Sequence, residues 1–91
     1  MPRERQTQVI AKFYADGRYD EQPCQMTLKD MQKFVGGIIQ IIPSWLPRRS
    51  LVVNDEGFLQ DLPQNHRATE LAHPQTLIID AIRGNALLIT S

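Results

Sequence analysis

The sequence lacks an excess of charge of either sign. Its 10 Lys and Arg residues balance 10 Asp and Glu residues, so the formal net charge is zero. Proteins that wrap duplex nucleic acid usually carry a clear basic excess, and we therefore expect no duplex nucleic acid as a partner. The balance still permits a small anionic ligand, because such a ligand needs only a local cluster of positive groups.

Cysteine and long hydrophobic runs are equally scarce. The single cysteine, Cys24, excludes an intrachain disulfide and a cysteine-based zinc site, and it fits the reducing cytoplasm. The most apolar run, residues 38–42, is too short to cross a bilayer. Residues 2–6 include charged side chains, but no apolar signal core follows them. We expect a cytoplasmic protein without a membrane partner.

Motifs for nucleotide cofactors and metals are missing as well. The sequence has no P-loop and no dinucleotide-binding fingerprint, and helix capping explains the doublet Gly36-Gly37. His66 and His73 stand seven residues apart, too far for the usual i, i+4 pair of metal ligands. Glu70 lies between them, yet these residues are ordinary for a solvated helix face. We expect no cofactor and no metal.

The sequence also has no motif that activates a nucleophile. Cys24 and the serines stand without the context of a base and an orienting group. Asp55, Glu56 and Asp61 leave acid–base chemistry open as an alternative, that of a small hydrolase. A solvated turn explains Asp55 and Glu56 better. We expect no catalytic residues and no enzymatic activity.

The length of the chain sets limits on its core. Its 91 residues suffice for one domain, and we expect a single domain over residues 1–91. A domain of this size buries only a modest share of its surface, so its core is marginal. Assembly into a homo-oligomer would bury more apolar surface, and we expect it.

Apolar patterns and turn residues predict an α+β fold, with a mainly antiparallel sheet of about five strands, one longer helix and one short helix. Residues 18–22 are polar and fit either a short strand or a loop. Phe58-Leu59 is expected to return as a strand after an acidic turn, and Gly84-Asn85 to join the last two strands as a hairpin. The predicted strands are residues 7–14, 38–42, 51–54, 76–82 and 86–90.

Capping residues define both predicted helices. The longer helix is expected to begin after Thr27, because Asp30 three residues later completes a capping box, and to end at Gly36. The short helix is expected over residues 65–72, with Asn65 as its cap. Residues 38–42 between the helices predict a strand that is buried on at least one face.

The first candidate site is the polar cluster where the short helix begins. Asn65, Arg67 and Thr69 stand together there, and helix N-termini attract anions. Arg67 would add a forked donor, Asn65 an amide and Thr69 a hydroxyl. The alternative is a plain cap by Asn65, followed by exposed polar residues.

The second candidate site is a loop bounded by prolines. Trp45 precedes Arg48 and Arg49, and an aromatic ring beside two guanidinium groups suits a stacked base and a phosphate. The alternative is a tryptophan that covers the edge of the domain beside two solvated arginines. Together with Asn54, which opens the acidic turn, the predicted ligand-binding residues are Arg67, Asn65, Thr69, Arg48, Arg49, Trp45 and Asn54.

Charge is also segregated along the chain. Arg48 and Arg49 have no acidic neighbour between residues 44 and 54, whereas Asp55, Glu56 and Asp61 have no basic residue among them. A solvated surface is the usual explanation. The alternative is that the basic loop of one subunit faces the acidic turn of another.

Four segments of the chain form an ordered set. They are Val-Gly-Gly-Ile-Ile at 35–39, Leu-Val-Val-Asn-Asp-Glu-Gly at 51–57, Leu-Pro-Gln-Asn-His-Arg-Ala-Thr at 62–69 and Gly-Asn-Ala-Leu-Leu-Ile at 84–89. Together they resemble a small domain family of unknown function that is common on bacteriophages, prophages and plasmids. The resemblance covers nearly the whole chain, with residues 1–6 and 45–49 less similar to the shared core.

The resemblance implies a non-enzymatic accessory protein of a phage or mobile element, acting in the host cytoplasm. Such proteins often counter host defence, and one strategy is an oligomeric sponge that sequesters an immune signal. We therefore expect a small anionic nucleotide-type ligand, of the cyclic oligonucleotide or cyclic ADP-ribose class. The alternative is an inhibitor that binds a host enzyme or defence protein through apolar residues around Trp45 and Leu46.

Overall fold

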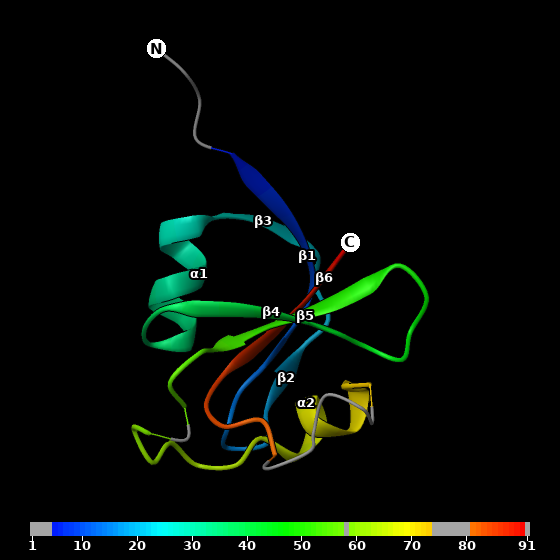
Figure 1. Ribbon diagram of the computed structural model, residues 1–91. Coiled ribbons are helices and arrows are strands. Elements are labelled where there is room, and N and C mark those ends of the chain that lie inside the picture. The colour runs from blue at the N-terminus through cyan, green and yellow to red at the C-terminus, as the bar shows by residue number, and fades with distance from the viewer. Residues whose placement is uncertain (1–4, 58, 74–80, 91) are drawn as a thin grey trace.

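The computed structural model describes residues 5–57, 59–73 and 81–90 (Figure 1). These residues form one sheet of six antiparallel strands and two helices, which confirms the predicted α+β fold. The elements are β1 Gln6–Phe13, β2 Tyr19–Asp20, β3 Cys24–Thr27, α1 Leu28–Val35, β4 Ile39–Pro43, β5 Arg49–Asn54, α2 His66–Leu71 and β6 Ala86–Thr90.

The sheet has the order β2-β1-β6-β5-β4. Strand β3 pairs with the first half of β1 and β2 with its last residues, so both lie on the side of β1 opposite to β6. The register between β1 and β6 shifts between Val9 and Ala11, as in a β-bulge. None of the described helices is long and apolar enough to span a membrane.

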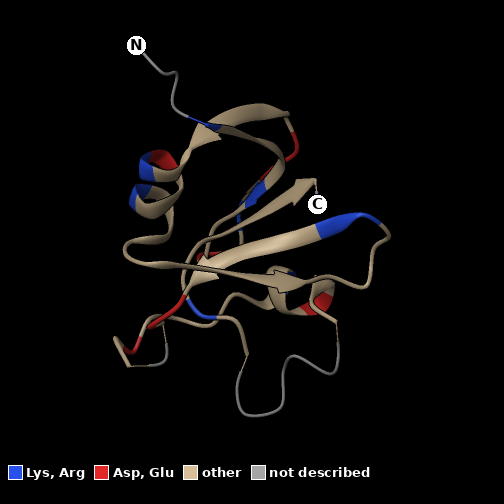
Figure 2. Cartoon of the chain, turned by 45° about the horizontal axis from the view of Figure 1, so that its top comes forward, with Lys and Arg blue, Asp and Glu red and all other residues tan. Residues whose placement is uncertain are grey.

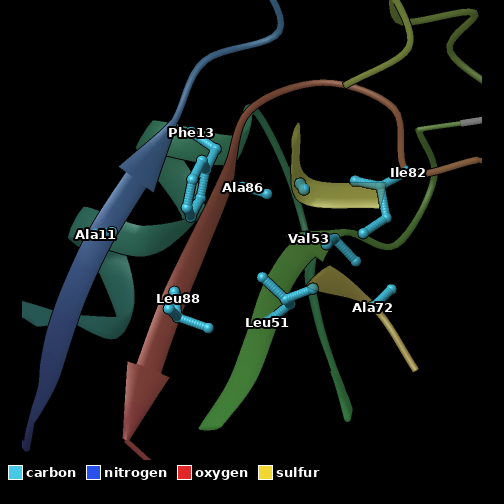
Figure 3. Packing of buried hydrophobic residues seen from close by; sticks show 9 residues of the cluster. Ala11, Phe13, Leu51, Val53, Ala72, Ile82, Ala86 and Leu88 are labelled. Atoms are coloured by element: carbon cyan, nitrogen blue, oxygen red, sulfur yellow. The ribbon is translucent and has the colours of Figure 1, made fainter. Parts of the chain in front are cut away.

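The two central strands are buried on both faces. Leu51 and Val53 of β5 belong to a cluster with Ala68 of α2, whereas Val52 belongs to a second cluster with Met31 of α1. Alternate residues of β6 divide between the same two clusters. Figure 3 shows the cluster on the α2 side, where side chains of β1, β5 and β6 meet. The helices therefore cover opposite faces of the sheet, and this explains the continuous apolar runs of its central strands.

The predicted beginning and end of α1 are confirmed. The Thr27 hydroxyl accepts a hydrogen bond from the backbone N–H of Asp30 at 3.2 Å, and the Asp30 carboxylate accepts one from the backbone N–H of Thr27 at 3.0 Å. Gly36 follows the helix with a φ of 87°, a left-handed conformation that glycine adopts without a steric penalty.

Strand β4 differs from the expected buried strand. It lies at the edge of the sheet, none of its residues is fully buried, and Ile41 is 58% exposed. Its partly buried residues Ile39 and Ile42 pack against the two opposite core clusters. The apolar composition predicted burial, but the position of β4 at the edge leaves it only partly covered.

Several connections between helices and strands also differ from the prediction. Cys24–Thr27 forms a strand that was not predicted, and Leu59 lies in a turn, while Phe58 lies outside the described residues. Gly84-Asn85 is not a hairpin loop, because β6 pairs with β1 and β5. Instead the segment before β6 pairs with the segment before α2, through a bridge between Gln64 and Arg83. Of the strand predicted at residues 76–82, residues 76–80 lie outside the described residues and residues 81 and 82 are irregular.

Candidate functional site

Asn65 lies at the centre of the predicted anion site, but it is only 1% exposed. Its side-chain oxygen accepts a hydrogen bond from the backbone N–H of Ala68 at 3.1 Å, which confirms the predicted cap. Its side-chain nitrogen donates to the carbonyl of Phe13 at 3.0 Å and to the carbonyl of Gly84 at 2.9 Å. The amide therefore ties α2 to β1 and to the segment that enters β6, and its polar atoms all have internal partners.

Thr69 has a similar internal role. Its hydroxyl donates to the carbonyl of Asn65 at 2.7 Å and accepts from the backbone N–H of Ile82 at 3.0 Å. The backbone N–H of Asn65 in turn donates to the carbonyl of Ile82 at 2.7 Å. The hydroxyl thus joins α2 to the segment before β6.

Asn54, at the acidic turn, is also engaged within the fold. Its side-chain oxygen accepts from the backbone N–H of Glu56 at 2.7 Å, and its side-chain nitrogen donates to the carbonyl of Val35 at 3.1 Å. A Cβ at Gly37 would lie 3.2 Å from that nitrogen, so a glycine fits the close approach of the two segments. The side chains of Asn54, Asn65 and Thr69 therefore bond within the fold, and the candidate site consists of other residues.

Of the predicted ligand-binding residues, Arg67 is exposed and lines a cavity. Its Nε donates to the carbonyl of Gly17 at 3.1 Å, and its Cζ lies 4.4 Å from the centre of the Tyr19 ring. These contacts hold the guanidinium between the β1–β2 turn and α2. Within the described part of the chain, its two terminal nitrogens have no hydrogen-bond partner. They are therefore available to a ligand.

Arg67 borders a groove between α2 and the sheet, which we call the α2 groove. Its volume is about 480 Å³. Apolar side chains of Ile10, Leu46, Leu71 and Leu88 contribute to its lining. Its polar residues are Glu21, Arg67 and Glu70, so two carboxylates accompany one guanidinium.

A second cavity also borders Arg67. It has a volume of about 460 Å³ and is lined by polar residues that include Asp16, His66, Arg67 and Glu70. The Asp16 carboxylate accepts from the backbone N–H of Arg18 at 3.0 Å and from its Nε at 2.7 Å. These hydrogen bonds, the backbone one first, lower the pKa of Asp16, so Asp16 carries a negative charge near neutral pH.

The Trp45 loop reaches α2 at the rim of the α2 groove. The indole N–H of Trp45 donates to the carbonyl of Glu70 at 3.0 Å, and its backbone N–H donates to the carbonyl of Leu71 at 3.1 Å. The side chain is nevertheless 57% exposed. Leu46, the next residue, lines the groove. Two segments that are far apart in sequence thus meet beside one cavity.

Arg48 and Arg49 lie at the far end of the β4–β5 hairpin, where Figure 2 shows them as a basic stretch. Arg48 has a φ of 57°, and Nη1 of Arg49 donates to the Arg48 carbonyl at 3.1 Å. Neither residue lines the α2 groove or the second cavity. The structure therefore does not bring these two guanidinium groups to the cavities beside Arg67.

Sequence reasoning missed Tyr19, Glu21 and Glu70 as site residues. Tyr19 and Glu21 come from a polar stretch without a motif, and only the pairing of β2 with β1 brings them to Arg67. The one available signal was an aromatic residue between charged neighbours. Among the described residues, no group of three or more His, Cys, Asp or Glu side chains is arranged to hold a metal ion.

Neither the curated proteins nor the solved structures contain a match to this chain. A family model does match, and it covers residues 13–91, from the end of β1 to the last residue. That match spans most of the chain and all of the residues that line the second cavity. The chain therefore belongs to the family described as Domain of unknown function (DUF3846).

Proposed function

We propose that this protein is a non-enzymatic binding protein that holds a small nucleotide-type ligand in the α2 groove. The observation that carries the proposal is Arg67, whose outer N–H groups stand at the junction of two cavities without a partner among the described residues. Because Nε is held by Gly17 and the guanidinium is held over Tyr19, the fork is oriented before a ligand arrives. A phosphate oxygen is the ligand group that this fork fits best.

The remaining lining of the α2 groove fits the other parts of a nucleotide. Its apolar side chains would cover a flat base. Glu21 and Glu70 would accept hydrogen bonds from amino groups of a base or hydroxyls of a ribose. A volume of about 480 Å³ falls within the range of small-molecule sites. With one guanidinium and two carboxylates, the groove favours one phosphate contact over a cluster of phosphates.

The biological role that we propose is sequestration of an immune signal, by a protein of a phage or mobile element. Its ligand would be of the cyclic oligonucleotide or cyclic ADP-ribose class, and the protein would act in the host cytoplasm. A binder that leaves its ligand intact lowers the free concentration of that ligand by mass action alone. A ligand with two nucleotide units would extend past Arg67 into the second cavity, because both cavities share Arg67 and Glu70.

Calorimetric titration with cyclic dinucleotides, cyclic ADP-ribose isomers and AMP tests the proposal. We expect binding by the native protein and a loss of at least about tenfold in affinity for Arg67→Gln, since a hydrogen bond to a charged group contributes about 1.5–3 kcal/mol. Arg48→Gln is the matched control, because Arg48 lines neither cavity. Chromatography of the recovered ligand should find it unchanged. Folded protein that binds none of these compounds would refute the proposal.

A second candidate function is direct inhibition of a host enzyme or defence complex. Trp45 favours it, because two hydrogen bonds hold the residue in place while its side chain stays 57% exposed. A rigid, exposed tryptophan is a frequent anchor of protein interfaces. Capture of a stoichiometric host protein by the native chain, and its loss with Trp45→Ala, would favour this function over ligand binding.

A further inference from the structure

The outer edge of β4 carries main-chain groups that are directed away from the sheet. The backbone N–H of Asp55 donates to the Ile38 carbonyl at 2.8 Å, and the backbone N–H of Ser44 donates to the Arg49 carbonyl at 3.4 Å. Bonded and non-bonded pairs alternate along an antiparallel ladder, so residues 38, 40, 42 and 44 bond to β5. The N–H and C=O groups of Ile39 and Ile41 therefore face outward.

Contacts at Pro43 agree with this assignment and limit the free edge. The carbonyl of Pro43 also faces outward, and it accepts a hydrogen bond from the backbone N–H of His73 at 3.1 Å. At the other end, the backbone N–H of Gly37 donates a hydrogen bond to the carbonyl of Gln32 at 3.0 Å. Among the described residues of β4, Ile39 and Ile41 are thus the ones whose outward N–H and C=O groups both remain unpaired.

Two usual protections of an exposed edge strand, charged side chains and bulges, are missing from β4. Natural edge strands are blunted by charged side chains, bulges or proline, but residues 34–47 contain no charged residue. Pro43 stands only at the last position of β4. Ile38 and Ile41 are each 58% exposed beside this edge. Such an edge favours pairing with another strand.

The sequence of the edge reads the same in both directions. Residues 38–42 read Ile-Ile-Gln-Ile-Ile, which is symmetric about Gln40. We propose that β4 pairs antiparallel with β4 of a second copy of this chain, about a two-fold axis at Gln40. In this register Ile39 of one copy faces Ile41 of the other, and these two residues exchange main-chain hydrogen bonds. Ile38 faces Ile42 of the other copy, so each apolar side chain meets another.

The charges at the two ends of the hairpin agree with this pairing. Asp55 and Glu56 follow the end of β5 that lies beside Ile39, whereas Arg48 and Arg49 lie at the end beside Pro43. Figure 2 shows these acidic and basic stretches at opposite ends of the hairpin. Antiparallel pairing places the basic end of each copy beside the acidic end of the other. A parallel arrangement would instead bring like charges together.

Sedimentation over a range of concentrations tests the dimer. We expect native protein to dimerise and Ile41→Lys to be monomeric, because each introduced ammonium group would lie against Ile39 of the other copy, where the proposed pairing packs one apolar side chain on another. Leu59→Lys is the matched control, since Leu59 is 81% exposed and lies outside β4. Circular dichroism confirms that each variant folds. Native protein that stays monomeric up to millimolar concentration, or dimers that survive Ile41→Lys, would overturn the proposal.

A disulfide tests the register itself. In the proposed pairing Gln40 faces Gln40 of the second copy at a non-hydrogen-bonded position, where Cα atoms lie about 4.5 Å apart. In a Cys24→Ser background, Gln40→Cys should form a covalent dimer in air, whereas Ile38→Cys should not. Equal cross-linking of both variants would overturn this register. Neither cavity is lined by residues 38–42, so failure of this dimer and failure of ligand binding are separate outcomes.

Discussion

Helices α1 and α2 begin with the same kind of hydrogen bond in very different surroundings. The hydroxyl of Thr27 caps α1 in a reciprocal bond with Asp30, and both groups belong to one exposed turn. The amide of Asn65 caps α2 while it is only 1% exposed, and it also donates to Phe13 and Gly84. The first cap stabilises a helix, whereas the second also joins three segments of the chain. The same local signal can therefore have a local or a global role.

Replacing Asn65 should have the largest effect on stability. Asn65→Ala removes the cap and both buried hydrogen bonds from the amide to the carbonyls of Phe13 and Gly84, so we expect a loss of at least about 3 kcal/mol in the free energy of unfolding. Asn65→Ser, which keeps a capping oxygen, should recover about 1 kcal/mol of that loss. Urea denaturation followed by circular dichroism measures both. A loss for Asn65→Ala no larger than that for Thr27→Ala would remove the distinction between the two caps.

Two glycines extend the comparison to turns. Gly84 and Gly17 have φ values of 82° and 98°, but a Cβ at Gly84 would lie 2.8 Å from Cδ1 of Leu62, whereas a Cβ at Gly17 would meet nothing within 4 Å. Gly17→Ala should cost about 1–2 kcal/mol, from the left-handed backbone alone. Gly84→Ala should cost about 1 kcal/mol more, because Leu62 must also move. Equal midpoints in urea for the two variants would show that Leu62 yields freely.

Removing the exposed cap should have a smaller effect. Thr27→Ala loses one capping hydrogen bond on a solvated turn, for which we expect about 1 kcal/mol. Thr27→Ser keeps the hydroxyl and is the matched control. The comparison requires that Thr27→Ala leave the fold intact, which the dispersion of amide resonances in an NMR spectrum would test.

The smallest expected effect is the pH dependence of the α1 cap. Hydrogen bonds from Thr27, the backbone one first, lower the pKa of Asp30 below its ordinary value of 3.8. A lowered pKa in the folded state stabilises the protein above the pKa of the unfolded state, and this contribution disappears as the pH falls through the folded pKa. Asp30→Asn should therefore reduce the loss of stability between pH 7 and pH 2. A loss that is unchanged in this variant would assign the acid sensitivity to other carboxylates, such as Asp16.

Local signals in the sequence were sufficient for the helix caps and the acidic turn. Thr27, Asp30 and Gly36 delimit α1, and Asn65 begins α2, as predicted. The backbone N–H of Gly57 donates to the Asn54 carbonyl at 3.2 Å, as expected for the turn over residues 54–57. Each of these features depends on contacts within four residues of sequence, and such contacts can be predicted from residue types.

Polar residue type did not reveal whether a side chain faces a ligand or the interior. Asn54 and Asn65 were predicted as ligand-binding residues, but each bonds to backbone groups of distant segments. Asn85 does the same, since it accepts from the backbone N–H of Ala15 at 3.0 Å and donates to the carbonyl of Phe34 at 3.2 Å. These three asparagines lie in segments that carried the family resemblance, so a structural role accounts for their presence there.

Apolar composition likewise left burial undecided. Residues 38–42 and residues 51–53 are both apolar and rich in β-branched side chains, yet β5 is buried while Ile41 of β4 is 58% exposed. The order of strands decides the difference, and that order depends on long-range pairing. Arg67 depends on the same pairing, because β2 supplies the Tyr19 ring against which its guanidinium rests.

The fold class, the capping of both helices and the acidic turn follow from the order of residue types, because each rests on periodicity or on contacts between near neighbours in the chain. Three other features follow from the folded arrangement of distant segments: which strand lies at the edge, which asparagines are buried, and which arginine borders a cavity. Those outcomes depend on hydrogen bonds and packing between segments that lie tens of residues apart. A local pattern of residue types does not encode such pairings, since each depends on where a distant segment of the chain lies.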